Sequence, residues 1–322
     1  MIRYIGKRLL WMIPVMLGIA VLIFSIMYIC PGDPAQSLLG PSASAVELAA
    51  KREEMGLNDP YIVRLGRYLY QTFIKFDLGT SYEFGTSVFA GLMERMQYTL
   101  VIALLCMALQ VFVGTPLGIM AATHHNGLWD RISMFLALVG VSIPAFWLAL
   151  MLVLLFSVKL GWLPASGMGG IQYYILPAIA NSLGGVAGIA RQTRSSILEV
   201  IRSDYVTTAR SKGLTEREVV YKHILPNALI PIITVAGGSF AAVFGGSVII
   251  ETVFSIDGIG LYMMSGITSR DYPVVQGCVV LLGVIFSLCM LLVDIAYAYV
   301  DPRIKAQYEG QSKKKIKGVA KA

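Results

Sequence analysis

Charged residues are scarce in this sequence: they make up 14% of its 322 residues, whereas apolar residues make up 56%. A typical soluble domain has about 25% charged residues. Several stretches of about 18 or more residues contain no charge at all, and such stretches are long enough to cross a bilayer as helices. The shortage of charge therefore excludes an ordinary soluble protein and predicts an all-α, polytopic membrane protein.

Cysteine and histidine are also rare. The cysteines show no C-x-x-C spacing, and the adjacent histidines have no third metal ligand close to them in the sequence; these residues are Cys30, Cys106, Cys278, Cys289, His124 and His125. Zinc sites and disulfide frameworks have characteristic spacings that are missing here. We therefore expect no metal site and no disulfide scaffold, and we interpret the cysteines as small buried apolar residues.

A nucleotide-binding motif is missing as well. The only Gly-Lys pair, Gly6-Lys7, is followed by Arg8, whereas a phosphate-binding loop needs G-x-x-x-x-G-K-[ST]. The apolar stretches contain no paired aspartates, no Ser/His pair and no His/Glu zinc set. We predict that the chain is not an enzyme, has no catalytic residues and binds no cofactor itself.

Six apolar stretches are long enough to span a bilayer, at residues 9–29, 98–122, 132–158, 173–190, 229–250 and 274–300. The first follows Arg3, Lys7 and Arg8 as a secretory signal would, but a cleavable signal has an apolar core of only about 7–15 residues. The stretch leads into Cys30-Pro31-Gly32-Asp33-Pro34 and not into a small-x-small cleavage site. We therefore predict six transmembrane helices, the first of them retained.

Lysine and arginine concentrate in three segments that an even number of spans places on one side of the membrane. These are the N-terminus, residues 191–222 and the tail after residue 300. Short cytoplasmic segments carry such an excess. We predict that both termini are cytoplasmic, and that the formal net charge of +7 reflects topology and contact with anionic membrane lipid, with no nucleic-acid partner.

The segment 31–97 is predicted to form a small helical subdomain on the opposite, external side. Apolar residues recur at helical spacing over 44–55 and 60–76, and Gly56-Leu57-Asn58-Asp59-Pro60 separates the two runs. The chain then divides into the N-terminus with the first span (1–30), the external subdomain (31–97), a core domain with five spans (98–305) and a basic tail expected to be disordered (306–322).

A polar segment at 191–227 separates the fourth and fifth spans, and it is too patterned for a simple loop. Helical spacing runs over 195–212, Gly213 follows as a C-terminal cap, and Thr215 with Glu218 forms a capping-box pattern that predicts a second helix over 215–224. Leu225-Pro226 is predicted to stop this segment where the fifth span begins. Two short braced helices predict a docking surface for another protein.

This segment resembles the cytoplasmic signature of bacterial ABC importer permeases, which reads E-A-A, three residues, G, nine residues, then I-x-L-P. The family Gly falls on Gly213 and the family Leu-Pro on Leu225-Pro226, whereas of E-A-A only Ala209 matches. The form Thr208-Ala209-Arg210-Ser211-Lys212-Gly213-Leu214 is similar to the branch that handles di- and oligopeptides, nickel or metal chelates. Further motifs resembling that branch occur in order: Pro31-Gly32-Asp33-Pro34, Asp77-Leu78-Gly79-Thr80-Ser81, Glu251-Thr252-Val253-Phe254 and Arg270-Asp271-Tyr272-Pro273. At Asp257-Gly258-Ile259-Gly260 the chain departs from the usual Pro-Gly-x-Gly.

The resemblance implies an architecture and a set of partners. The fold would be that of a type I ABC importer permease, and the chain would form half of the translocation pathway beside a second homologous permease subunit. Two ATPase subunits, which bind ATP and Mg, and an extracytoplasmic substrate-binding protein would complete the complex in the bacterial inner membrane. The residues implied to couple to an ATPase are Asp204, Tyr205, Thr207, Thr208, Ala209, Arg210, Lys212, Gly213, Leu214, Leu225 and Pro226.

The charge-poor spans also bear on the energy source. A proton- or sodium-coupled carrier places ionisable residues near the midplane of the membrane, whereas the predicted span interiors contain one clear acid, Asp294, near the cytoplasmic end. We therefore favour an ATP-driven peptide importer over a secondary carrier, with a nickel or metal-chelate importer as the alternative within the family. Polar candidates for the pathway, or for hydrogen bonds between helices, are Gln97, Gln110, Asn181 and Gln276.

Overall fold

Most of the chain that the structure describes is helical. The computed structural model describes the backbone of residues 2–300 and the side chains of residues 5–297, so the predicted tail at 306–322 lies outside the described residues. The helices are α1 (Ile2–Ile29), α2 (Pro34–Leu39), α3 (Ala45–Glu54), α4 (Tyr61–Phe73), α5 (Val88–Thr123), α6 (Leu128–Ser142), α7 (Ala145–Leu152), η1 (Val153–Lys159), α8 (Gln172–Val200), α9 (Asp204–Ser211), α10 (Glu216–Glu218), η2 (Val219–Ile224), α11 (Leu225–Phe254), α12 (Ile259–Ser269) and α13 (Tyr272–Val300). Within residues 2–300 the only extended pairing is an isolated bridge between Thr80 and Ser87.

Five helical segments of the described chain are long and apolar enough to cross a membrane. They are Ile5–Ile29, Val88–Thr123, Gln172–Val200, Glu216–Phe254 and Tyr272–Tyr297. These segments contain the predicted first, second, fourth, fifth and sixth spans, apart from the last few residues of the sixth. The prediction of an all-α polytopic membrane protein is confirmed.

The third predicted span, 132–158, is not one continuous helix. It consists of Leu128–Ser142 and Ala145–Lys159, which meet at an angle of 97°, so the count of six spans holds only if this bent pair is one span. Pro144 lies at the bend, and Ile143 before it has an extended backbone. Proline disfavours the helical conformation in the residue that precedes it and has no N–H to donate, so the helix ends there.

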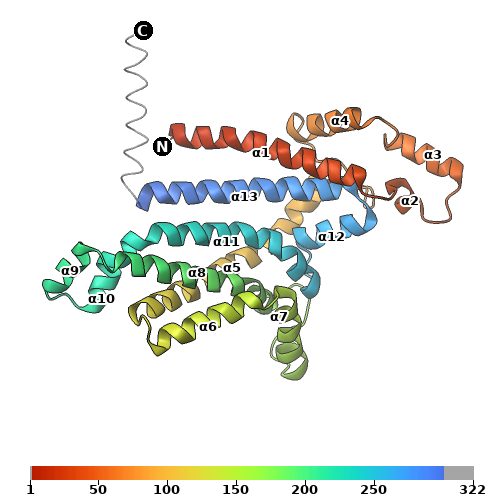
Figure 1. Cartoon of the computed structure of the whole chain (residues 1–322). Helices are drawn as coiled ribbons and strands as arrows, with labels where there is room; N and C mark the ends of the chain where they lie inside the picture. The colour runs from red at the N-terminus through yellow and green to blue at the C-terminus, as the bar shows by residue number, and fades with distance from the viewer. Residues whose placement is uncertain (1, 301–322) are drawn as a thin grey trace, which may run out of the picture.

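The bundle is organised around α8, which contacts α5, α6, α7 and α11. Figure 1 shows α1 lying beside α13 on one side of the bundle and α6 on the other, with α8 and α11 between them. A cluster of buried apolar residues that includes Ile102, Leu176 and Phe244 joins α5, α8 and α11.

Two glycines of α5 explain why α5 and α8 approach so closely. A Cβ atom on Gly114 would lie 2.8 Å from the carbonyl oxygen of Val186, and one on Gly118 would lie 2.5 Å from the carbonyl oxygen of Ala190. Two glycines four residues apart therefore form a flat face against which the α8 backbone packs directly, as in many membrane helix pairs.

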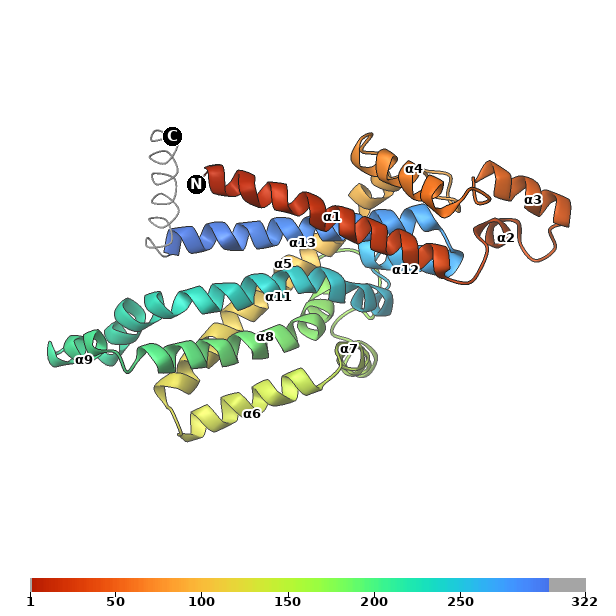
Figure 2. The same ribbon diagram turned by 45° about the horizontal axis from the view of Figure 1, so that its top comes forward.

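The two ends of the bundle differ. One end, which we call the α9 end, carries α9 and α10; the opposite end, the α12 end, carries α2, α3, α4 and α12 (Figures 1 and 2). The helices expected at 44–55 and 60–76 are present as α3 and α4, whereas the short helix α2 was not predicted. Ser44 and Glu47 form a capping box at the start of α3, and the hydrogen bonds from Ser44 lower the pKa of Glu47.

Helix α4 fastens these short helices to α1. The hydroxyl groups of Tyr61 on α4 and Ser25 on α1 are 2.7 Å apart, and the ring of Tyr68 stacks on that of Phe24 with centroids 5.4 Å apart. Burial against α1 raises the pKa of Tyr68 to about 12. The division into domains at residues 30, 97 and 305 stays a prediction.

Candidate functional site: the segment between α8 and α11

The polar segment between the fourth and fifth predicted spans forms a compact helical projection at the α9 end of the bundle (Figure 2). The helix expected over 195–212 is instead two helices, because α8 ends at Val200 and α9 begins at Asp204. Ser203 between them has an extended backbone, and Asp204 lies in the first turn of α9. Serine is favoured at helix starts, and an acidic residue in the first turn is stabilised by the helix dipole, so a new helix starts here.

The turn after α9 follows the sequence prediction closely. Gly213 has a φ of +80°, a left-handed conformation that glycine adopts without strain. No atom lies within 4 Å of the position that a Cβ would take there, so the glycine is required by backbone conformation and not by space. Thr215 and Glu218 form the predicted capping box at the start of α10. Across the turn, the Arg210 guanidinium donates two hydrogen bonds, of 2.7 and 3.1 Å, to the Glu216 carboxylate.

Helix α9 has a buried inner face and an exposed outer face. Val206 and Ala209 are buried, at 0% and 5% exposure, in an apolar cluster with Val219, Val220 and Ile224 of η2. The outer side chains are exposed: Asp204, Tyr205, Thr207, Thr208, Arg210 and Lys212. The inner face fixes the helix on the bundle, and the outer face presents an aromatic ring, hydroxyls and charges to the surroundings.

The predicted stop at Leu225-Pro226 is wrong. The segment Glu216–Phe254 is one continuous helix, in which η2 leads directly into α11. The N–H of Leu225 bonds to the carbonyl of Val220, five residues back, and Pro226 falls in the first turn of α11. A π-helical turn re-routes the backbone hydrogen bonds, so the missing N–H of proline and its ring are accommodated without a break. Leu214 and Leu225 pack partly buried against the α9 cluster.

An ion pair that sequence reasoning missed ties the end of α8 to the neighbouring turn. The Arg194 guanidinium donates to the Asp130 carboxylate at 2.6 and 2.8 Å, and the N–H of Asn126 donates to the same carboxylate at 2.9 Å. The Asp130 side chain is only 5% exposed. The sequence shows only an isolated aspartate at the start of an apolar stretch. Its partner Arg194 lies 64 residues away along the chain, so the sequence does not indicate that the two residues pair.

The four polar pathway candidates do not meet at one place. Gln110 on α5 lies against Gly185 of α8, and Asn181 of α8 lies against Gly246 of α11, so these two polar residues share the α5–α8–α11 contact. The Oε1 of Gln110 and the Nδ2 of Asn181 are buried and have no hydrogen-bond partner. Gln97 is exposed and donates to the carbonyl of Glu94 at 3.0 Å, and Gln276 is buried on α13. A role for any of them in a pathway stays a prediction.

A second buried acid, also missed, lies at the α12 end. Glu251 lies just beyond the predicted fifth span (229–250), but in the structure it is within α11 and is 0% exposed. Its carboxylate accepts hydrogen bonds from Thr99 at 2.7 Å and from the N–H groups of Gly260 and Leu261 at 2.6 and 3.1 Å. It therefore caps the N-terminus of α12 from another helix.

The glycines of the Asp257-Gly258-Ile259-Gly260 turn follow from this cap. A Cβ on Gly258 or Gly260 would lie 2.5 or 2.8 Å from the Glu251 carboxylate, so only glycine leaves room for the acid. Asp257, which stands where the family pattern has proline, pairs with Arg95 at 2.7 Å. At the position where this chain departs from the family pattern, the side chain therefore forms an ion pair with α5.

Family models match almost the whole sequence. Residues 114–306 match the family described as "Binding-protein-dependent transport system inner membrane component", and residues 1–103 match "Binding-prot-dependent transport system membrane comp, N-term". The chain belongs to this family of membrane components of binding-protein-dependent transport systems.

Several peptide permeases align with this chain over nearly their full length. The chain is 40% identical to the dipeptide transport system permease protein DppB of Alkalihalophilus pseudofirmus over 95% of the chain and 100% of that protein. It is 42% identical to a putative peptide transport system permease protein of Brucella abortus and 41% identical to the glutathione transport system permease protein GsiC of Salmonella paratyphi A, in each case over 95% of the chain and 99% of the relative.

Solved structures show the same fold at low identity. An inward-facing form of the MetNI methionine ABC transporter matches with a TM-score of 0.58 at 20% identity, over 66% of this chain and 97% of that chain. An amino acid ABC transporter with histidines matches with a TM-score of 0.52 at 16% identity, over 64% of this chain and 92% of that chain.

Proposed function

We propose that this chain is the transmembrane permease subunit of an ATP-driven importer of short peptides. The observation that carries the proposal is the braced projection at the α9 end, where α9 is fixed by its buried face and presents an exposed outer face. The chain has no phosphate-binding motif, so an ATP-driven transporter built from it needs a separate ATPase. The projection is the element to which that ATPase would bind.

The geometry suits the transmission of force. Val206 and Ala209 of α9 pack against η2, which continues into α11 without a break, and the end of α8 is held by the Arg194–Asp130 pair. A displacement of α9 would therefore be transmitted to the membrane helices α8 and α11, through packed side chains and a continuous backbone. Packed cores of this kind move between discrete arrangements and do not deform gradually.

The charge distribution supports an orientation with the α9 end in the cytoplasm. The segment 191–222 and the N-terminus carry the excess of lysine and arginine, and the start of α1 lies at the α9 end (Figure 1). In this orientation α2, α3, α4 and α12 face outward in the bacterial inner membrane, where an extracytoplasmic binding protein would dock. A second permease subunit would complete the pathway.

A coupled carrier is less well supported. Asp294, the acid predicted to lie within a span, pairs with Arg8 on α1. The buried acids Asp130 and Glu251 are each held by several hydrogen bonds to fixed donors. The ion pair and the hydrogen bonds give these acids structural roles, and such roles explain their presence without a proton relay.

The substrate class follows from the named relatives. The three proteins compared above are called dipeptide, peptide and glutathione permeases, and each aligns with 95% of this chain. Dipeptides and glutathione are both short peptides, so we infer a short peptide as the substrate of this chain and place nickel or a metal chelate second.

The decisive experiment is transport by the reconstituted complex. The chain would be placed in proteoliposomes with the second permease, the two ATPase subunits and the binding protein of its transport system, and uptake of a labelled dipeptide would be measured with and without ATP. We expect uptake only with ATP. Uptake driven by a proton gradient in vesicles that hold this chain alone would overturn the proposal, and ATP-driven uptake of nickel but not of dipeptide would reassign the substrate.

A matched pair of variants tests the role of α9. Ala209→Glu puts a charge into the buried inner face, whereas Thr208→Glu puts the same charge on the exposed outer face one residue away. We expect Ala209→Glu to abolish substrate-stimulated ATP hydrolysis, because a buried unpaired carboxylate displaces the helix. Wild-type stimulation in the Ala209→Glu complex would contradict the assignment.

A further inference from the structure

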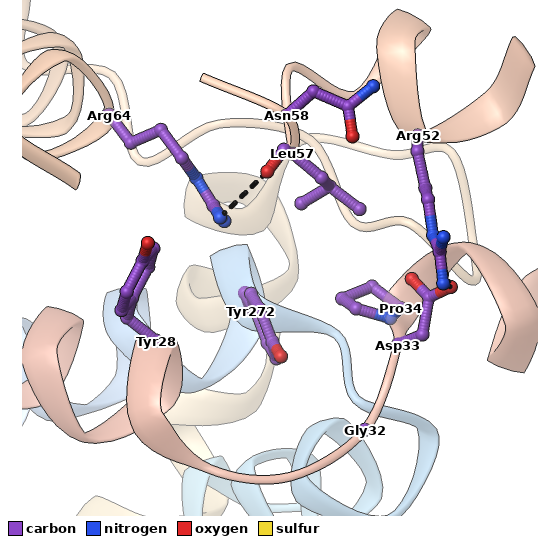
Figure 3. A pocket seen from close by; sticks show the side chains of 9 residues that line it. All are labelled: Tyr28, Gly32, Asp33, Pro34, Arg52, Leu57, Asn58, Arg64 and Tyr272. Carbon is purple, nitrogen blue, oxygen red and sulfur yellow. Dashed lines mark hydrogen bonds and ion pairs between the residues drawn. The ribbon is translucent and has the colours of Figure 1, made fainter. Parts of the chain in front are cut away.

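A polar pocket of about 280 Å³ lies at the α12 end (Figure 3). It is formed where the end of α1, the start of α2, the turn between α3 and α4, and the start of α13 come together. Its polar lining includes Tyr28, Asp33, Arg52, Asn58, Arg64 and Tyr272. The segment around α9 is at the other end of the bundle, so the pocket is separate from the site described above.

Three sequence motifs that the docking segment does not use meet around this pocket. Pro31-Gly32-Asp33-Pro34 and Gly56-Leu57-Asn58-Asp59-Pro60 supply lining residues, and Tyr272 comes from Arg270-Asp271-Tyr272-Pro273. Gly32 has a φ of +128°, and a Cβ on it would overlap the Arg270 guanidinium, which donates to the carbonyl of Pro31. The backbone at the edge of the pocket is thus fixed by a contact that only glycine permits.

The charges that line the pocket do not cancel. Arg52 pairs with Asp33 at 2.7 Å, so one guanidinium is neutralised. Arg64 forms no ion pair with the side chains of residues 5–297; it donates to the carbonyl of Leu57 at 3.3 Å and lies 5.3 Å from the centroid of the Tyr28 ring. Two arginines and one aspartate leave a net charge of +1 on the lining.

The orientation of Arg64 leaves its donors available. Figure 3 shows its guanidinium directed between the Leu57 carbonyl and the two tyrosines, toward the interior of the pocket. The Arg64 guanidinium makes a cation–π contact with the Tyr28 ring, and its one hydrogen bond among the described residues goes to the Leu57 carbonyl. An arginine held in this way presents a planar fork of donors that matches a carboxylate.

We propose that this pocket binds a carboxylate group through Arg64. A carboxylate matches the planar fork of donors on Arg64, and its single negative charge neutralises the net charge of the lining residues. The carboxylate comes either from the C-terminus of a free peptide or from an acidic side chain of the extracytoplasmic binding protein. Only the choice between these sources rests on the proposed function, and the first experiment below does not depend on it.

The first experiment measures the reactivity of Arg64 in the full chain held in lipid nanodiscs. Phenylglyoxal modifies exposed guanidinium groups, and mass spectrometry reads the modification of each arginine separately. N-acetyl-trialanine and its C-terminal amide differ only in the carboxylate. We expect the acid, but not the amide, to slow modification of Arg64. Arg67 of the same helix pairs with Asp59 and does not line the pocket, so it should react at an unchanged rate. Equal protection by the amide, or better protection by inorganic phosphate, would overturn the proposal.

The second experiment uses matched variants. Arg64→Gln and Arg67→Gln each remove one positive charge from α4, but only the first changes the pocket. Binding of N-acetyl-trialanine, followed by saturation-transfer NMR, is expected to weaken about tenfold in Arg64→Gln, as the loss of one charge-assisted hydrogen-bonded pair implies, and to stay unchanged in Arg67→Gln. Unchanged binding in Arg64→Gln would count against the site.

A third measurement separates the two sources. If a protein side chain occupies the pocket, Arg64→Gln weakens docking of the purified binding protein to the nanodisc complex, and Arg67→Gln does not. If the peptide itself occupies it, docking is unchanged and the loss of peptide binding remains. No effect on either would overturn the carboxylate site, whereas failure of ATP-driven uptake with intact protection of Arg64 would overturn only the proposed function.

Discussion

The hydroxyl group of Thr99 on α5 donates a hydrogen bond of 2.7 Å to the carboxylate of Glu251 on α11. The same hydroxyl accepts a hydrogen bond of 2.9 Å from the N–H of Ile259, the first residue of α12. With the bonds that Glu251 accepts from Gly260 and Leu261, the first three N–H groups of α12 are paired with side chains of two other helices. These two residues therefore fix where α12 starts relative to α5 and α11.

Replacing Glu251 by alanine is expected to destabilise the α12 end. The change leaves one buried and one partly buried N–H group without acceptors, which lowers the free energy of unfolding by about 3 kcal/mol. The measurement is thermal unfolding of the purified protein in detergent, together with hydrogen exchange of residues 259–261. Thr252→Ala, an exposed neighbour on the same helix, is the control and should behave as the wild type. Equal midpoints for the two variants would contradict the capping role.

A methyl group added to Gly118 is expected to push α5 and α8 apart. In Gly118→Ala the new atom would lie 2.5 Å from the carbonyl oxygen of Ala190, an overlap that a rigid backbone relieves only by moving. Overpacking of this kind costs about 1–3 kcal/mol. Gly184→Ala on α8 is the control, since nothing lies within 4 Å of its new Cβ. The expected result is a lower unfolding midpoint for Gly118→Ala alone.

Gly213→Val is expected to uncouple the transporter. Valine resists the left-handed backbone that Gly213 adopts at φ +80°, at a cost of about 1–2 kcal/mol, so α9 and α10 lose their relative orientation. Substrate-stimulated ATP hydrolysis by the reconstituted complex should be lost while the chain still inserts. Gly213→Asn is the matched variant, because asparagine tolerates this conformation, and it should retain most of the stimulation. Normal stimulation in the valine variant would argue against a rigid turn.

Asp130→Ala is expected to loosen the end of α8. Removing the carboxylate leaves Arg194 partly buried without its partner, which costs about 3 kcal/mol for a buried pair. Hydrogen exchange of residues 191–200 should speed up in this variant. Glu216→Ala breaks the exposed pair with Arg210 instead, where about 0–1 kcal/mol is expected, and should leave that exchange unchanged. Faster exchange of these residues in Glu216→Ala than in Asp130→Ala would show that other contacts hold the end of α8.

Sequence reasoning succeeded where the determinant is local. The apolar stretches predicted the membrane-crossing helices because each is long enough to bury its own backbone hydrogen bonds. The capping box at Thr215 and the turn at Gly213 formed as predicted, since each depends on residues within four positions of one another. The docking role of the segment around Gly213 remains a proposal carried by family membership and by its geometry.

The errors arose where neighbouring structure overrides a local signal. Pro144 bends the third predicted span, whereas Pro226 leaves the fifth continuous, because a π-helical turn before it re-routes the hydrogen bonds. Both prolines follow apolar residues, and nothing in the residues beside them distinguishes the two outcomes. The break at Ser203 likewise divided a run whose apolar spacing continues through it.

The sequence by itself determined the place of the apolar stretches, the Thr215 cap and the charge asymmetry, because these depend on residue type and on short-range geometry. Only the tertiary structure decided which polar groups meet. Thr99 and Glu251 are 152 positions apart, Asp130 and Arg194 are 64 apart, and the Arg64 pocket collects residues from α1 to α13. Such pairs depend on how helices cross, and crossing is fixed by close contacts such as those of Gly114 and Gly118 with the α8 backbone.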